Sequence, residues 1–167
     1  KPLDLKGKKI GVYSLSSGTR QNLQVLLHQV GLTEKDVSIQ VTGLLNFAPV
    51  IQGQVDATAA TDTGLYVAKL KGLKDFNIIE VKDYLNVPSD MFVVTEDTYI
   101  FKKDLLRRFL SAYKDCTQWM IDNPKEAAKV AEKRSINGRN EVVNFDIIKI
   151  RNASAVSKTT IKKGLGH

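Results

Sequence analysis

The sequence predicts an α/β fold built on a mainly parallel sheet, and three features of its pattern support this. Short apolar segments rich in β-branched residues alternate, over about the first 95 residues, with segments whose apolar residues recur every three or four positions. Glycines follow the helical segments, where they favour a helix end. The connections are short, and strands that alternate with helices at such spacing usually pair in parallel.

Five strands and three helices are expected in this part of the chain. The helix over residues 19–30 has one apolar face of leucine and valine side chains and is followed by Gly31. The other helices are expected to run from a cap at Asn46 to Gln52 and from a cap at Asp62 or Thr63 to Leu70. The strands are expected at residues 8–14, 37–41, 55–60, 76–81 and 91–95.

After about residue 98 the pattern is helical only. Helices are expected at residues 101–122, 124–134 and 141–151, and residues 152–167 are expected to be a loop or tail. Because no strand alternates with these helices, they should cover a sheet or core formed elsewhere. The predicted organisation is an α/β lobe over 1–97, a helical segment over 98–151, and the tail.

Composition and the single cysteine exclude several classes of protein. Hydrophobic residues make up 43% of the 167 positions and charged residues 26%, as in ordinary soluble proteins. No stretch approaches the roughly 20 apolar residues that span a membrane, and residues 1–6 lack the apolar region of a signal peptide. The chain is therefore either cytoplasmic or begins after its export signal. Cys116 is alone, which excludes an internal disulfide and a thiolate metal cluster.

The net charge of +7 is unevenly distributed. Residues 1–100 hold 10 Lys and Arg against 11 Asp and Glu, whereas residues 101–167 hold 15 against 7. A basic surface over Lys102, Lys103, Arg107 and Arg108 could bind nucleic acid or another anionic surface. However, acidic residues are interleaved with these charges at helical spacing, which favours a solvated helix face. We therefore expect no nucleic-acid partner.

Two hydroxyl-rich turns are the strongest candidates for a binding site. Residues 14–19 (Ser-Leu-Ser-Ser-Gly-Thr) and 61–64 (Thr-Asp-Thr-Gly) each lie between a predicted strand and a helix. Helix N-termini carry unpaired N–H groups and partial positive charge, and open α/β sheets bind ligands beyond the carboxyl ends of their strands. The predicted ligand-binding residues are Ser16, Ser17, Gly18, Thr19, Thr61 and Asp62.

A purely structural role is the alternative for both turns, because Ser, Thr and Asp commonly cap helices. The first turn is not a phosphate-binding P-loop, since the G-x-x-x-x-G-K-[ST] pattern is absent. Few residues could support catalysis: His28 lies within a predicted helix, His167 ends the chain, and no Cys–His or HExxH spacing occurs. We predict no catalytic residue, no metal site and no cofactor.

Four phrases of the sequence occur in the same order in a known family. They are DLKGKKIGV at residues 4–12, GLTEKDV at 31–37, QGQVDA at 52–57, and NPKEAA at 123–128 after a helix containing FLSAY and WM. In this order the phrases resemble the type II solute-binding proteins of ABC importers, in the NMT1/THI5-like superfamily of alkanesulfonate, taurine, nitrate and thiamine-pyrimidine precursor proteins.

The resemblance implies a periplasmic-binding-protein-like fold, in which two α/β lobes close on a small organic ligand, anionic or heteroaromatic. Residues 1–97 would be the second lobe and residues 98–151 the helices that return to the first, whose opening part the chain lacks. The resemblance further implies an export signal upstream, a periplasmic or membrane-anchored location, an ABC permease as partner, and a monomer.

Carried over by position, the family's ligand loop falls on residues 16–20 and its strand-end motif on residues 61–63. The tryptophan and proline that sulfonate binders have at the second motif are absent, which argues against a sulfonate ligand. The cysteine-rich motif and histidine of the pyrimidine synthase branch are also absent, so we expect no enzymatic activity of that kind. Two alternatives remain open: an effector-sensing domain of a transcription regulator, and an enzyme on the same scaffold.

Overall fold

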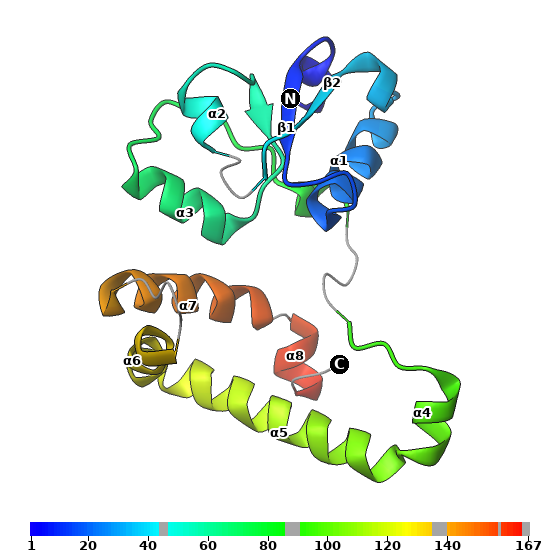
Figure 1. Ribbon diagram of the computed structural model, residues 1–167, viewed down its shortest axis with the longest axis vertical. Helices are drawn as coiled ribbons and strands as arrows, with labels where there is room; N and C mark the ends of the chain where they lie inside the picture. The colour runs from blue at the N-terminus through cyan, green and yellow to red at the C-terminus, as the bar shows by residue number, and fades with distance from the viewer. Residues whose placement is uncertain (44–46, 86–90, 135–139, 157, 165–167) are drawn as a thin grey trace. The chain divides into compact units, whose positions relative to one another are not determined.

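The chain folds into two compact units in a computed structural model, which describes residues 1–43, 47–85, 91–134, 140–156 and 158–164. The N-terminal unit comprises Lys1–Ser89 and the C-terminal unit Asp90–His167. Figure 1 shows strands and helices together in the first unit and helices in the second. The α/β fold with a parallel sheet is therefore confirmed. The division expected at residue 97, between an α/β lobe and a returning helical segment, stays a prediction.

Three parallel strands form the sheet of the N-terminal unit. The central strand β1 (Lys9–Val12) lies between β2 (Ser38–Val41) and β3 (Ala57–Thr58). In the register of the sheet, Ile10 pairs with Ile39 and with Ala57. Because the three strands run in the same direction, their carboxyl ends lie at the same edge of the sheet.

Three helices of the N-terminal unit flank these strands, as the sequence predicts. Helix α1 (Gly18–Gln29) follows β1, α2 (Ala48–Ile51) precedes β3, and α3 (Asp62–Leu70) follows β3. The described residues of this unit also include the short 3-10 helices η1 (Pro2–Leu5), η2 (Glu34–Asp36) and η4 (Val81–Asp83). The cap expected at Asn46 lies outside the described residues.

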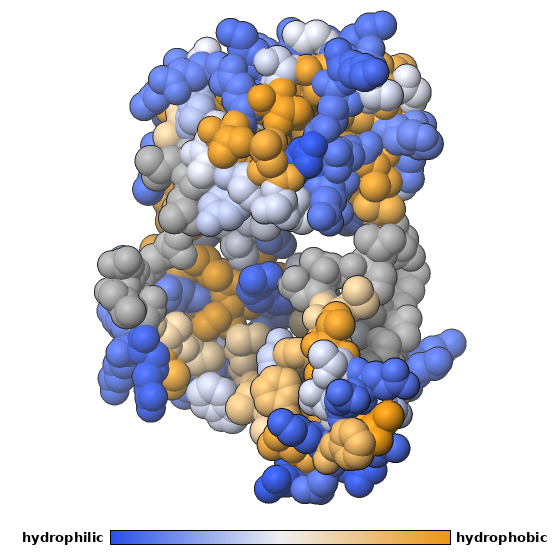
Figure 2. All heavy atoms as spheres, turned by 45° about the vertical axis from the view of Figure 1, so that its right-hand side comes forward, coloured by the Kyte–Doolittle hydropathy of each residue, from blue (hydrophilic) through white to orange (hydrophobic). Residues whose placement is uncertain are grey.

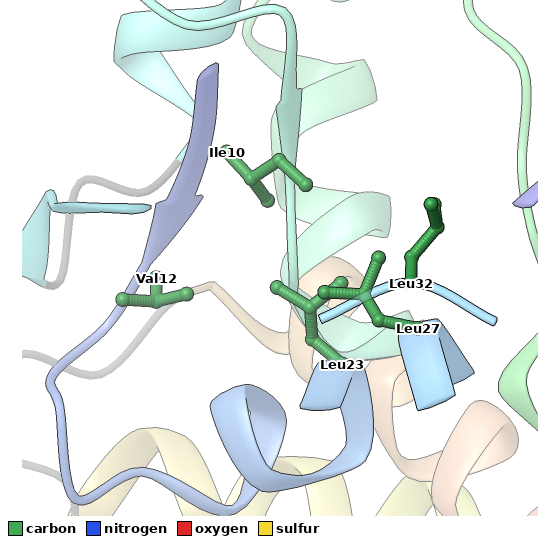
Figure 3. Close-up of a cluster of buried hydrophobic side chains, with 5 residues drawn as sticks. All are labelled: Ile10, Val12, Leu23, Leu27 and Leu32. Carbon is green, nitrogen blue, oxygen red and sulfur yellow. The ribbon is translucent and has the colours of Figure 1, made fainter. Parts of the chain in front are cut away.

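The core of the N-terminal unit lies between β1 and α1. Figure 3 shows side chains from the strand and the helix meeting in this cluster, whose members are Ile10, Val12, Leu23, Leu27 and Leu32. Val12 and Leu27 have no exposed surface. Burying one such side chain contributes about 1.5–3 kcal/mol, so this cluster holds the strand that precedes the first hydroxyl turn.

The predictions of strands at residues 76–81 and 91–95 are wrong. In the structure, residues 76–80 and 91–94 belong to no sheet, Val81 begins η4, and Thr95 caps a helix. Val93 is 84% exposed and Met91 is 72% exposed. A short apolar segment forms a strand only when a neighbouring strand completes its hydrogen-bond ladder, and no described segment pairs with these two.

The described part of the C-terminal unit is helical. It contains α4 (Glu96–Phe101), α5 (Lys103–Asp122), α6 (Pro124–Arg134), α7 (Glu141–Ala155) and α8 (Lys158–Lys163). The helix expected over 101–122 is broken at Lys102, and the loop or tail expected over 152–167 contains the end of α7 and all of α8. None of the helices in the described ranges is long and apolar enough to cross a membrane.

The core of the C-terminal unit lies between α6 and α7. Ala127, Ala128 and Ile148 are buried there, with Met120 and Phe145 packed against them. The side chains of α6 and α7 thus meet through alanines, which allow the two helices to approach closely.

Candidate functional site

The first hydroxyl turn is held by its own hydrogen bonds at the start of α1. Ser17 is the N-cap residue: its Oγ accepts the backbone N–H of Arg20 at 3.3 Å and donates to the carbonyl of Ser14 at 2.8 Å. The Oγ1 of Thr19 lies 3.2 Å from the Oγ of Ser17. The capping role is therefore present, and the first N–H groups of α1 still lack a carbonyl partner within the helix.

The surface around this turn is open. Ser16 is exposed, and its Oγ lies 3.3 Å from the Oγ of Ser14. Gly18, the first residue of α1, is also exposed, and a Cβ built on it would meet no heavy atom within 4 Å. A ligand could approach the backbone here without steric hindrance from the described neighbours.

The second hydroxyl turn repeats the arrangement at the start of α3. Thr61 is the N-cap residue, and its Oγ1 accepts the N–H of Gly64 at 3.3 Å and lies 3.2 Å from the Oγ1 of Thr63. Asp62 is exposed, and its Oδ1 accepts the N–H of Thr63 at 2.7 Å. Both turns therefore place a cap hydroxyl beside a second hydroxyl two residues later.

The sheet topology brings the two turns to the same edge. Strands β1 and β3 are neighbours, with Gly11 paired to Thr58, and both turns follow the carboxyl ends of these strands. Residue 13 connects β1 to the first turn, and residues 59–60 connect β3 to the second turn. The six predicted site residues thus lie in two turns at the same edge of the sheet.

Arg20, which the resemblance places in the family's ligand loop, is bound by two neighbours within the N-terminal unit. Its Nε and Nη2 donate to the two carboxylate oxygens of Glu34 at 2.8 and 2.6 Å, and its Nη1 donates to the carbonyl of Leu15 at 2.7 Å. The charge is therefore neutralised by a two-pronged ion pair. Arg20 fixes the turn through the carbonyl of Leu15.

Two threonines that sequence reasoning missed flank the end of β1. Thr42 Oγ1 donates to the carbonyl of Val12 and Thr58 Oγ1 to the carbonyl of Gly11, each at 3.2 Å. A Cβ built on Gly11 would lie 3.1 Å from Thr42 Cγ2 and 3.3 Å from Thr58 Oγ1. A glycine inside a strand signals such a close approach. Gly11 was therefore the sequence signal that could have pointed to the two threonines.

An aromatic residue at this edge was missed as well. The ring of Phe47, the residue before α2, lies against Gly64 in the first turn of α3: a Cβ built on Gly64 would be 3.1 Å from the ring carbon Cε2. No local pattern identifies this contact, because the two residues are far apart in the sequence.

A surface depression lies away from the two turns. It has a volume of about 380 Å³ and lies at the C-terminal half of α1, lined by Gln24, His28, Leu32, Thr33, Glu34 and Lys35. His28 is exposed. Nowhere in the described ranges do three His, Cys, Asp or Glu side chains converge as metal ligands.

Comparison with known proteins identifies the family. The family model described as "NMT1/THI5 like" matches residues 1–127, a range that includes both hydroxyl turns. The chain belongs to the NMT1/THI5-like family. This confirms the resemblance that the four phrases of the sequence indicated.

Relatives of this NMT1/THI5-like chain are longer. A Haemophilus influenzae protein whose name links it to thiamine biosynthesis is 29% identical over 126 residues, which cover 74% of this chain and 40% of the relative. The crystal structure of the periplasmic aliphatic sulphonate binding protein SsuA from Escherichia coli superposes with a TM-score of 0.76 at 19% identity. That match covers 89% of this chain and 50% of SsuA, and it establishes the periplasmic-binding-protein fold.

Proposed function

We propose that this chain contains the ligand-binding turns of a solute-binding protein, which captures a small organic molecule for an ABC-type importer. The observation that supports the proposal is the pairing of two hydroxyl-capped helix starts at neighbouring strand ends. Both turns carry backbone N–H groups and hydroxyls at one edge of the sheet, and such groups can hold an anionic or polar group. Membership of the NMT1/THI5-like family favours the same function.

The proposed mechanism is binding without covalent chemistry. N–H groups of Gly18 and Thr19, with the hydroxyls of both turns, would hold the polar end of the ligand. A second lobe would close over it, and closure of two lobes about a hinge is a common way to exclude water. Of the six predicted site residues only Asp62 is titratable, and it has no His or Cys neighbour in its turn. The protein would act outside the cytoplasmic membrane, in the periplasm or anchored to the membrane, with a permease as partner.

Calorimetry tests the proposal in the protein as its gene encodes it. A panel of carboxylates, sulfonates and pyrimidines identifies a ligand, and the double variant Ser17→Ala/Thr19→Ala then removes both hydroxyls of the first turn. Each lost hydrogen bond is worth about 1 kcal/mol, so the affinity should fall about tenfold or more. Thr95→Ala is the matched control, because it removes the N-cap hydroxyl of α4.

The outcomes separate binding from capping. Loss of affinity in the double variant but not in Thr95→Ala supports the proposal. Unaltered affinity in the double variant, with a lower unfolding temperature, would show that the first turn serves only as a helix cap.

A further inference from the structure

We propose, building on the function above, that Arg20 and Glu34 are positioning residues of the ligand site, which aim the backbone N–H of Ser16 at the ligand. The guanidinium of Arg20 makes three hydrogen bonds: two to the carboxylate of Glu34 at 2.8 and 2.6 Å, and one to the carbonyl of Leu15 at 2.7 Å. The side chains of Arg20 and Glu34 are only partly exposed. One side chain of α1 thus joins the first hydroxyl turn to a separate element, η2.

Glu34 is firmly anchored because the backbone on both sides of it is held. The N–H of Leu32 donates to the carbonyl of Leu27 at 2.9 Å, and both side chains belong to the buried core cluster. Glu34 then begins η2, whose last carbonyl accepts the N–H of Gly7 at 2.7 Å. Arg20 therefore ties the first turn to backbone that the core holds.

The bond to Leu15 matters because of where its carbonyl lies in the turn. The turn is closed by the N–H of Ser17, which donates to the carbonyl of Ser14 at 3.2 Å. Leu15 and Ser16 are its two central residues. The peptide between the central residues of such a turn can point in either of two directions, which distinguish the common turn types. Arg20 holds the carbonyl of this peptide and thereby selects one direction.

Holding the carbonyl also orients a donor. In a trans peptide the C=O and the following N–H lie in one plane and point in opposite directions, and the described residues contain no cis peptide. The N–H of Ser16 therefore points away from Arg20, and no oxygen of a described residue accepts it. Ser16 is exposed, so a ligand can reach this N–H. Arg20 acts on the ligand through the backbone, without touching it.

Nuclear magnetic resonance of the protein as its gene encodes it tests the inference. Acetate, methanesulfonate and uracil represent the three ligand classes of the panel, and they are titrated well below the unfolding temperature, where a merely structural loss leaves the affinity unchanged. Arg20→Gln and Glu34→Gln should each weaken binding about three- to tenfold, and the ligand-induced shift of the Ser16 amide proton should shrink in both. The double variant should lose no more affinity than either single variant, because the two residues act as one unit.

Asp104→Asn is the matched control. It removes the carboxylate of an ion pair with Arg108 in the C-terminal unit, and it should leave the affinity and the Ser16 shift unchanged. Glu34→Gln separates positioning from direct contact. If Arg20 bound an anionic ligand itself, its release from Glu34 and the loss of a neighbouring negative charge would raise the affinity for acetate and methanesulfonate, whereas positioning lowers it.

The remaining results overturn defined claims. Tighter binding in Glu34→Gln, unaltered affinity in Arg20→Gln, or an equal loss in Asp104→Asn would overturn the positioning role while the solute-binding function stands. The absence of shifts in both hydroxyl turns with all three probes would overturn that function, and the positioning role with it.

Discussion

The two units of this protein bury their apolar side chains to different extents. In the N-terminal unit, β1 and α1 share a core in which Ile10, Val12 and Leu27 are at most 1% exposed. In the C-terminal unit, α5 has 20 residues and none of them is buried. Figure 2 shows apolar residues at the surface of the C-terminal helices beside hydrophilic ones.

The exposed apolar residues of the C-terminal unit still contact one another. Phe92, Phe109 and Tyr113 form a cluster whose ring centres are 4.9–6.4 Å apart, although each residue is 49–57% exposed. The difference between the units shows that an apolar stripe at helical spacing specifies a helix but not its burial. Burial depends on what packs against the stripe, and the sequence leads us to expect that these helices cover a core formed elsewhere.

The largest expected effect is at the centre of the N-terminal core. Leu27→Ala removes a side chain with no exposed surface, and such substitutions cost about 2–5 kcal/mol of unfolding free energy. Urea unfolding, monitored by hydrogen exchange of the β1 amides, measures this loss of unfolding free energy. A loss below about 1 kcal/mol would show that this unit lacks a rigid core.

The next largest effect is expected from breaking an ion pair of the N-terminal unit, which should cost more unfolding free energy than breaking one of the C-terminal unit. Glu34→Gln breaks the two-pronged pair with Arg20, whose side chain is 23% exposed, and should cost about 1–2 kcal/mol. The matched control in the C-terminal unit is Asp104→Asn. It removes the pair with Arg108, in which both side chains are more than 70% exposed, and should cost less than about 0.5 kcal/mol. Equal losses of unfolding free energy in Glu34→Gln and Asp104→Asn, measured by urea unfolding, would contradict the expected difference between the two ion pairs.

A smaller effect is confined to acid pH. The backbone N–H and the hydroxyl of Thr33 donate to Asp36 Oδ2 at 2.9 and 3.0 Å and hold the pKa of Asp36 below its ordinary value. A depressed folded-state pKa contributes stability above the unfolded pKa of about 4, and that contribution disappears as the pH falls through the folded pKa.

Asp36→Asn tests this contribution. Its unfolding free energy should fall less steeply than that of the unmodified protein between about pH 4 and pH 2. Parallel curves in denaturant titrations over this range would exclude a contribution from the Thr33 hydrogen bonds.

The smallest effect is expected on α5. Leu105 is 51% exposed, so Leu105→Ala, the same substitution as in the N-terminal core, should change stability by less than about 0.5 kcal/mol. The fluorescence of Trp119, the single tryptophan and a residue of α5, reports unfolding of this unit. A loss above about 1.5 kcal/mol would show that this face is covered in solution.

Local sequence determined the helices and their N-caps, which depend on residues close together along the chain. Helix periodicity located α1, α3, α6 and α7, and Ser17 is the N-cap of α1 as expected. The N-cap of α3 is Thr61, one or two residues before the expected Asp62 or Thr63. These outcomes depend on hydrogen bonds between residues three or four positions apart, which the order of residue types specifies. The family phrases added the fold, which periodicity alone does not define.

Only the tertiary structure decided the contacts between residues distant in sequence. Arg20 meets Glu34, Phe47 lies against Gly64, and the hydroxyl of Thr58 reaches β1, all through packing of separate elements. The same dependence explains the two strands that did not form, since a strand needs a partner to complete its hydrogen bonds. Residue order encodes local hydrogen bonds directly, whereas these contacts exist only after the sheet has brought its strand ends together.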